Sequence, residues 1–463
     1  MLRTYYIETH GCQMNEHDSE RVAGLLHQRG LVQVFDPREA DLFLLNTCSV
    51  REKAVRKVYS RLGELRARKR ENPSRRIGVL GCVAQQEGRE LLRRAPHVDF
   101  VLGPPMYHSL PDLLDDLVSN APPPAGAVFA AIDASKFLED TGPVRRCNHF
   151  RAGVTVMEGC NRRCSYCIVP FTRGMERNRP AASILEEIRR LADEGYVEVL
   201  LLGQTVNAYR DPQRRGYRFA ELLADAAQVP GLRRIRFTSP HPRYFTPSLI
   251  QVIAGYENIC GQVHLPLQSG SSAILRRMHR QYDREFYLGL IDRFRACRRE
   301  IALSTDVIVG FPGESEQDFE ATLEVVRYAR FEQMFSFKYS PRPHTQAAAW
   351  HDDVPEEEKS RRLAALQQLQ REIQLEIHND KYLGRTFEIL VEGPAKDGRR
   401  LSGRTESNKV VNFSGDSLPG EFSRVRITGY GANSLLGEPL IDCRLVETAG
   451  EEVTWSASSE LRA

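Results

Sequence analysis

Residues 153–174 read GVTVMEGCNRRCSYCIVPFTRG, an apolar strand followed by three closely spaced cysteines. We call Cys160, Cys164 and Cys167 the motif cysteines. Iron–sulfur clusters are held by cysteine thiolates, and soft sulfur ligands suit iron or zinc. Three cysteines within eight residues can bind three corners of one cubane cluster and leave the fourth iron open to another ligand. This stretch therefore predicts a metal centre at the end of a strand.

Zinc is the alternative occupant, with Cys147 or His149 as a fourth ligand. A structural zinc site usually combines two short cysteine pairs, and this region has only one group of close cysteines. The spacing therefore favours an iron–sulfur cluster. The surrounding segment is rich in arginines that would offset thiolate charge and offer contacts to an anionic partner: Arg145, Arg146, Arg151, Arg162, Arg163, Arg173, Arg177 and Arg179.

The segment after the motif alternates between apolar and amphipathic stretches. We expect strands at 153–159, 197–203, 233–239, 262–268, 302–311 and 334–340. We expect helices at 181–195, 218–228, 285–300 and 316–330. About six β/α units of this kind predict a partial (β/α) barrel, whose sites lie at the carboxyl ends of the strands.

The first 100 residues repeat one pattern, an apolar strand that runs into a cysteine and then into a helix beginning near Glu16 or Ser49. We call Cys12, Cys48 and Cys82 the N-terminal cysteines. Strands that alternate with helices favour a parallel α/β sheet, in which ligands bind at the carboxyl ends of strands. The pattern predicts that these three cysteines meet at one edge. Isolated cysteines are also common as buried thiols, and the pattern alone leaves that alternative open.

The rest of the chain suggests a linker, a connecting helix and a third domain. Residues 119–146 lose periodicity and are rich in Pro and Ala, and residues 354–380 form one long polar helical stretch. Short strands separated by Gly, Pro, Asn and Asp follow, which is typical of a small antiparallel β-barrel. We predict an N-terminal α/β domain at 1–120, a linker at 121–145, the partial barrel at 146–380, the small barrel at 381–446 and a tail at 447–463.

Composition bounds the class of protein. The 463 residues suggest about three domains. Hydrophobic residues make up 41% and charged residues 27%, as in a globular protein, and the net charge of +3 says little about partners. The N-terminus shows no signal peptide, and no stretch approaches the roughly 20 apolar residues of a membrane helix. We therefore expect a cytoplasmic protein whose 10 cysteines are ligands or buried thiols, not disulfides.

Several motifs together resemble the radical S-adenosylmethionine (SAM) methylthiotransferase family over essentially the whole chain. They are VMEGCNRRCSYCIVPFTRG, LLGQTVNAY, HLPLQSGS, DVIVGFPGE and YSPRPHT, with GCQMN, NTCSVREKAVRKV and GCVAQQ near the N-terminus. The resemblance implies two 4Fe-4S clusters, one on the motif cysteines and one on Cys12, Cys48 and Cys82. It also implies SAM on the open iron of the first cluster and an RNA-binding TRAM domain at the C-terminus. Thr205 departs from the family, in which asparagine is usual.

The GCQMN context is similar to family members that modify prenylated tRNA. The implied reaction adds a methylthio group to C2 of N6-dimethylallyladenosine next to the anticodon, with one SAM consumed as methyl donor and one as radical source. An electron donor such as a flavodoxin or ferredoxin and a sulfur source are implied partners. Alternatives are a methylthiotransferase acting on threonylcarbamoyladenosine tRNA or a ribosomal protein aspartate, a ferredoxin-like electron carrier, and a zinc-bound RNA-binding protein.

Contacts beyond the cysteines are hypotheses. For SAM we expect Tyr166, between two motif cysteines, with Gly203 and Gln204 at a strand end; the glycine also fits a simple tight turn. For RNA we expect phosphate contacts from Arg173, Arg177 and Arg179. We also expect contacts from the small barrel, through Arg404, Lys409 and Phe413 on or beside one strand. The alternative for the small barrel is a packing domain without RNA contact. Cys147, Cys260, Cys297 and Cys443 match no motif and are expected to be core thiols.

Overall fold

The computed structural model describes residues 2–49, 52–118, 127–129 and 144–440. It divides into two compact units, one of Met1–Ile377 with Glu406–Asn408, and one of the remaining residues from His378. Most of the predicted linker and the tail at 447–463 lie outside the described residues. No helix in the described ranges combines the length and apolarity needed to cross a membrane.

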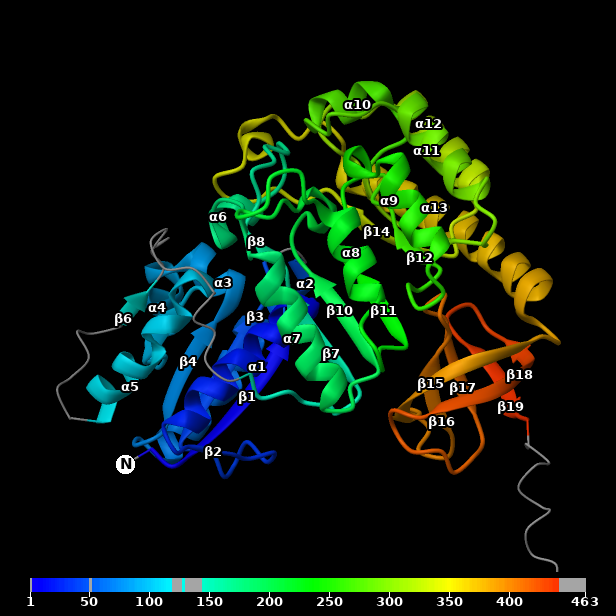
Figure 1. Cartoon of the computed structure of the whole chain (residues 1–463). Helices are drawn as coiled ribbons and strands as arrows, with labels where there is room; N and C mark the ends of the chain where they lie inside the picture. The colour runs from blue at the N-terminus through cyan, green and yellow to red at the C-terminus, as the bar shows by residue number, and fades with distance from the viewer. Residues whose placement is uncertain (1, 50–51, 119–126, 130–143, 441–463) are drawn as a thin grey trace, which may run out of the picture. The chain divides into compact units, whose positions relative to one another are not determined.

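The first unit begins with a six-stranded sheet in which every pair is parallel (Figure 1). Its strand order is β2-β1-β3-β4-β5-β6, with β1 (Thr4–His10), β2 (Val32–Gln33), β3 (Leu42–Thr47), β4 (Arg76–Leu80), β5 (Phe100–Leu102) and β6 (Ala127–Phe129). The central strand β3 is buried along its whole length, as its run LFLLNT requires for a parallel strand covered on both faces. The predicted α/β sheet is confirmed.

Helices and turns cover both faces of this sheet. They are α1 (Gln13–Gln28), α2 (Glu52–Glu71), α3 (Gly81–Glu87), α4 (Arg89–Arg94), the 3₁₀ turn η1 (Pro104–Ser109) and α5 (Leu110–Val118). One hydrophobic core contains Leu44 with Leu26 of α1, and the other contains Leu45 with Leu62 of α2. Because successive side chains of a strand point to opposite faces, neighbouring residues of β3 enter different cores.

Six further strands form the predicted partial barrel. Parallel β7 (Arg151–Thr155), β10 (Glu198–Leu202) and β11 (Arg234–Phe237) make one sheet, and parallel β12 (Gln262–His264), β13 (Ala302–Val309) and β14 (Gln333–Lys338) make another. Between the two sheets, Ile235 of β11 forms an isolated parallel bridge with Ile259. A short antiparallel pair, β8 (Met157–Glu158) and β9 (Arg177–Asn178), frames the motif.

The helices of this region alternate with its strands, as predicted. They are α6 (Val169–Arg173), α7 (Ala181–Asp193), α8 (Phe219–Ala227), α9 (Pro247–Gly255), α10 (Ser272–Arg277), α11 (Arg284–Arg295) and α12 (Glu316–Ala329). Figure 1 shows α7 and α8 lying along the outside of the β7–β10–β11 sheet. Helix α9 was not expected from the sequence. It begins with Thr246 as its cap and Pro247 in its first turn.

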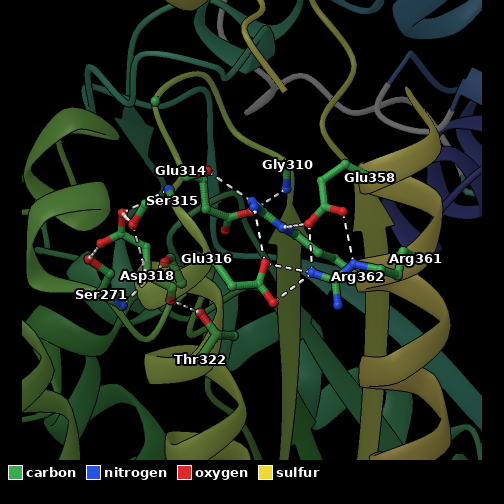
Figure 2. A network of polar contacts seen from close by, with 12 residues as sticks. Ser271, Gly310, Glu314, Ser315, Glu316, Asp318, Thr322, Glu358, Arg361 and Arg362 are labelled. Atoms are coloured by element: carbon green, nitrogen blue, oxygen red, sulfur yellow. Dashed lines mark hydrogen bonds and ion pairs between the residues drawn. The ribbon is translucent and has the colours of Figure 1, made fainter. Parts of the chain in front are cut away.

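The long polar stretch forms α13 (Glu356–Ile377), which is more than a connector. Its Leu366 and Ile373 are buried, and its arginines reach the start of α12 (Figure 2). Arg362 donates to the backbone and side-chain oxygens of Glu314, both at 2.9 Å, and Arg361 donates to Glu316 at 2.6 Å. The helix therefore belongs to the outer layer of the partial barrel, and its polar sequence concealed that packing.

The second unit is a closed five-stranded barrel that follows a π-helical turn, η6 (His378–Tyr382). Its order is β15-β16-β17-β19-β18, with β15 (Thr386–Pro394), β16 (Leu401–Arg404), β17 (Val410–Phe413), β18 (Phe422–Tyr430) and β19 (Leu435–Pro439). Every pair is antiparallel except β17 with β19. A closed ring with an odd number of strands cannot alternate direction throughout, so one parallel pair is unavoidable.

Candidate metal centres

The N-terminal cysteines meet at the carboxyl edge of the first sheet. Cys12 follows β1, Cys48 follows β3 and Cys82 follows β4, and these three strands are adjacent. The backbone nitrogen of Cys48 donates to His10 at 2.9 Å, which holds two of the strand ends together. A hydrogen bond with the Cys48 thiol lowers the pKa of Cys12, whereas burial raises the pKa of Cys82. The predicted convergence at one edge is what the structure shows.

Two asparagines of the N-terminal motifs hold the ends of the strands together at this edge. Asn15 and Asn46 are fully buried, and Asn15 Nδ2 donates to Asn46 Oδ1 at 3.1 Å. Oδ1 of Asn15 also lies 3.4 Å from the Cys12 sulfur. Gly81 has a φ of +90°, and a Cβ there would lie 2.4 Å from Thr47 O. The glycine before Cys82 is therefore required by both the backbone conformation and the space.

The motif cysteines lie in the loop between β8 and α6. The backbone nitrogen of Cys160 donates to Gly174 at 3.1 Å, and that of Cys167 donates to Cys164 at 3.1 Å. Burial raises the pKa of Cys160 and of Cys167, and the thiol of Cys164 raises both further. The thiols of Cys160 and Cys167 are therefore poor thiolates by themselves. They become stable ligands when a cationic centre binds them, because metal coordination deprotonates a thiol outright.

Two side chains from outside the motif contact its sulfurs, Thr205 after β10 and Arg280 between α10 and α11. The hydroxyl of Thr205, which follows β10, lies 3.3 Å from the sulfur of Cys160. Arg280 is buried and donates to the sulfur of Cys164 at 3.5 Å and to the hydroxyl of Tyr282 at 3.1 Å. Hydrogen bonds to cluster sulfurs tune the reduction potential of iron–sulfur centres. The contact of Arg280 could not be predicted from the sequence, since that residue lies 116 positions from Cys164.

Of the three residues expected at SAM, Tyr166 lies within the motif, and Gly203 and Gln204 directly follow β10. The Tyr166 ring packs edge-on against Phe311, with centroids 6.2 Å apart and planes at 79°. A Cβ at Gly203 would lie 2.5 Å from the Met157 side chain, so this glycine permits β8 and β10 to approach. Oε1 of Gln204 is buried and has no hydrogen-bond partner among the described residues. An orphaned buried acceptor of this kind fits a site that receives a polar ligand.

The arginines around the motif are largely engaged within the protein. Arg173 is 4% exposed and donates to Asp18 at 2.6 and 3.3 Å. Arg179 is buried and donates to Thr155 O at 2.7 Å and to Glu187 at 2.8 Å. The predicted phosphate contacts of Arg173 and Arg179 do not fit these placements, because each guanidinium is enclosed with a carboxylate. Arg177 is partly exposed, 3.9 Å from Glu158, and remains a candidate.

The three residues predicted on or beside one strand of the small barrel are divided between two: Arg404 ends β16, Lys409 precedes β17 and Phe413 ends β17. Nε of Arg404 donates to Glu392 at 3.0 Å. Lys409 is 8% exposed and lies 5.7 Å from the centre of the Tyr382 ring. Phe413 is 1% exposed and belongs to the barrel core, so its side chain does not fit the predicted RNA contact. Exposed arginines occur instead on β18, where Arg424 and Arg426 alternate with buried Val425 and Ile427.

The described residues fit iron–sulfur clusters better than a single metal ion. No three His, Cys, Asp or Glu side chains in these ranges are arranged to hold one ion, which is unfavourable for the zinc alternative. A cubane cluster spreads its thiolates over separate irons, so its ligands need not surround one point. The N-terminal cysteines follow three parallel strands, and the motif cysteines lie in one loop after β8, so either group could give each thiolate to a separate iron and would leave one iron open.

Comparison with protein families divides the chain into three matched segments. Residues 4–103 match the Uncharacterized protein family UPF0004, residues 154–326 match the Radical SAM superfamily, and residues 380–440 match the TRAM domain. The radical SAM methyltransferase TsrM from Kitasatospora setae, solved with cobalamin and a 4Fe-4S cluster, has a similar fold. It aligns over 75% of this chain and 77% of its own with a TM-score of 0.54 at 16% identity.

Full-length relatives give the family. The tRNA-2-methylthio-N(6)-dimethylallyladenosine synthase of Solibacter usitatus is 47% identical over 442 residues, which cover 94% of this chain and 98% of that relative. The enzyme of the same name from Carboxydothermus hydrogenoformans is 47% identical over 430 residues, covering 92% and 97%. The chain therefore belongs to the tRNA-2-methylthio-N(6)-dimethylallyladenosine synthase family of radical SAM methylthiotransferases.

Proposed function

We propose that this protein adds a methylthio group to C2 of N6-dimethylallyladenosine beside the anticodon of tRNA, using SAM and two 4Fe-4S clusters. The observation that carries the proposal is the presence of two cysteine triads, one at the carboxyl edge of the first sheet and one in the loop after β8, in a chain that is 47% identical over nearly its full length to an enzyme named for this reaction. Since the substrate is tRNA, we place the reaction in the cytoplasm. An electron donor such as a flavodoxin or ferredoxin and a source of sulfur complete the scheme.

The motif cysteines would hold the cluster that binds SAM. When bound and reduced, that cluster would supply the electron that cleaves SAM to the radical needed to attack an unactivated carbon. Thr205 and Arg280 would hydrogen-bond the sulfurs of Cys160 and Cys164, and Arg280 would offset thiolate charge from a buried position. Tyr166 and Gln204 would contact SAM. Replacement of Gln204 by Ala is expected to weaken SAM binding, and unchanged affinity and turnover would remove Gln204 from the site.

The N-terminal cysteines would hold the second cluster, where sulfur is methylated before transfer. Cys12 is the exposed member of this group, and Cys48 and Cys82 are buried, so the open side of the site is the side of Cys12. Asn15 and Asn46 would keep the strand ends at a fixed separation, because their amides join α1 to β3. This arrangement would hold the cluster rigidly and leave one face accessible to substrate.

The substrate base would reach the site from a single-stranded loop. Enzymes that modify a base atom take the base out of its stack, and proteins read RNA mainly at such loops. The TRAM domain and the partly exposed Arg177 would provide contacts to the phosphate backbone of the RNA. Within the TRAM domain, Arg424 and Arg426 suit phosphates better than Lys409, which is largely buried.

Nucleoside mass spectrometry tests the proposal. Anaerobically reconstituted protein is incubated with reductant, SAM and tRNA bearing dimethylallyladenosine, and in parallel with threonylcarbamoyladenosine tRNA. We expect the methylthio product only on the prenylated tRNA. Replacing all motif cysteines by Ala should abolish both SAM cleavage and product, whereas replacing the N-terminal cysteines should abolish product and leave SAM cleavage.

Cys297→Ala, which changes a cysteine outside both groups, is the matched control and should retain full activity. SAM cleavage without product on either tRNA would overturn the proposed substrate. Equal product from the variant without N-terminal cysteines would overturn the second cluster.

A further inference from the structure

A buried ion pair connects α1, which follows Cys12, with α6, which follows the motif cysteines. Asp18 of α1 is 1% exposed and lies six residues beyond Cys12, and Arg173 ends α6, six residues beyond Cys167. Their two hydrogen bonds, at 2.6 and 3.3 Å, connect residues 155 positions apart. Removing two charges from water is unfavourable, so a buried pair on its own is weak evidence for stability. The position of this pair between the two groups of cysteines suggests instead an electrostatic role at a cluster.

Arg173, the cation of this pair, lies on the side of the N-terminal cysteines. Helix α6, which carries Arg173, packs against α3, which carries Cys82. Arg173 is 4% exposed, and its guanidinium lies close enough to the side chains of Cys82 and Cys12 to interact with both. Arg173 is therefore a buried cation placed beside ligands that belong to the other half of the unit.

A second polar group points to the same place. Tyr107 lies in η1, which packs against both α3 and α6, and its side chain is 2% exposed. Its hydroxyl is buried and has no hydrogen-bond partner among the described residues. A buried donor left without an acceptor is unfavourable. The groups that interact with this hydroxyl include Asp18, Arg173 and Cys82, so it lies in the same buried polar region and is available to a group bound at the cysteine site.

We propose that Arg173, oriented by Asp18, and the Tyr107 hydroxyl stabilise the negative charge that the N-terminal cluster gains on reduction and thereby raise its reduction potential. The inference rests on the second cluster of the proposed function. Added negative charge is stabilised by a nearby cation in a region of low dielectric, and hydrogen bonds to cluster sulfurs act in the same direction. Because Arg173 belongs to the segment that follows the motif cysteines, the radical SAM region sets the potential of a centre it does not ligate.

The experiment measures reduction potential in full-length protein. The parent variant has Ala at all motif cysteines, so that only the N-terminal cluster contributes, and it is reconstituted anaerobically with iron and sulfide. Spectroscopic redox titration compares the parent with versions carrying Arg173→Met, Arg173→Lys, Asp18→Asn and Tyr107→Phe. A second parent, with Ala at the N-terminal cysteines, carries the same changes and reports the other cluster.

Opposite signs are expected from the two partners of the ion pair. Arg173→Met and Tyr107→Phe should shift the potential of the N-terminal cluster to more negative values, Asp18→Asn should shift it to more positive values, and Arg173→Lys should stay close to the parent. The other cluster should move much less. A purely structural role would move the Arg173→Met and Asp18→Asn proteins in the same direction or not at all, and either result overturns the inference.

Iron content separates this inference from the proposed function. If the parent with only the N-terminal cysteines binds no cluster, the second cluster is wrong, whatever Arg173 does. If the parent binds a cluster and Arg173→Met does not, retention of the cluster by Arg173→Lys supports the need for a cation. Loss of the cluster from both, with an intact fold, assigns Arg173 to structure and overturns the inference.

Discussion

Asn15 and Asn46 hold each other through two hydrogen bonds in the core of the first sheet. Nδ2 of Asn15 donates to Oδ1 of Asn46 at 3.1 Å, and Nδ2 of Asn46 donates to the backbone oxygen of Asn15 at 2.8 Å. Asn15 is three residues after Cys12, and Asn46 is two residues before Cys48. The pair therefore sets the separation of two strand ends that carry proposed cluster ligands.

Asn46→Ala is expected to reduce stability and cluster retention together. The change leaves the buried amide of Asn15 without its main acceptor, which costs about 1–3 kcal/mol. Thermal unfolding and iron content after anaerobic reconstitution measure the two effects. Asn433→Ala, which alters an exposed asparagine before β19, is the control and should change neither. Full iron content in the Asn46→Ala protein would contradict the role given to the pair.

Gly81 and Gly195 offer a matched test of the turn before Cys82. Their φ angles are +90° and +91°, so replacement by Ala imposes the same backbone strain, about 1–3 kcal/mol. A Cβ at Gly81 would meet Asn46 Oδ1 and Thr47 O at 2.4 Å, whereas a Cβ at Gly195 meets nothing within 4 Å. Denaturant unfolding should show a larger loss for Gly81→Ala, accompanied by loss of iron. Equal losses would mean that space at Gly81 is unimportant.

Thr205→Val is expected to slow SAM cleavage. The substitution keeps the shape of the side chain and removes the hydroxyl that lies 3.3 Å from the Cys160 sulfur. Loss of a hydrogen bond to a cluster ligand makes the cluster harder to reduce. The rate of 5′-deoxyadenosine formation at limiting reductant measures the effect, with Thr205→Ser as the variant that restores a hydroxyl. If the Thr205→Val and Thr205→Ser proteins form 5′-deoxyadenosine at the same rate, the hydroxyl has no part in reduction of the cluster.

Glu314 should give the free energy of unfolding a dependence on pH between about 4.5 and 6. Burial raises its pKa to about 6, despite hydrogen bonds from Gly310 and Arg362 (Figure 2). The folded protein then binds more protons than the unfolded chain in this window, so stability is lost as pH rises through it. A shift of this size corresponds to about 2 kcal/mol at most.

Glu314→Gln removes this titration. Wild-type protein should lose stability relative to the variant as pH increases from 4.5 to 7, and thermal midpoints across that range report it. Glu357→Gln, at an exposed position of α13, should follow the wild-type curve. A constant difference between wild type and Glu314→Gln at every pH would show that Glu314 titrates normally.

Arg424 and Arg426 should contribute to tRNA binding through phosphates. Both side chains are exposed on the outer face of β18. Replacing both by Ala should weaken binding at low salt and reduce the slope of log affinity against log salt by about two. Arg190→Ala, an exposed arginine of α7, is the control. An unchanged slope would exclude β18 from the RNA contact.

The parallel sheets and the meeting of Cys12, Cys48 and Cys82 could be predicted because each cysteine follows an apolar strand. The ion pairs could not. The basic character of residues 145–180 is visible in the sequence, but the carboxylate that pairs with Arg173 lies 155 positions away, so a buried cation was interpreted as a phosphate contact. Phe413 was misassigned although Val411 and Phe413, two residues apart on β17, share the buried face. The strands β16 and β19 could not be predicted, because they are short and contain glycine.

The contact between Asp18 and Arg173 also limits how the chain can be recombined with its relatives. The family matches at residues 4–103 and 154–326 suggest two exchangeable modules, yet this pair crosses the boundary between them. A chimaera that takes one segment from a parent lacking the matching charge would bury an unpaired ion, at a cost of about 3–5 kcal/mol. Functional hybrids should therefore inherit α1, α3 and α6 from a single parent.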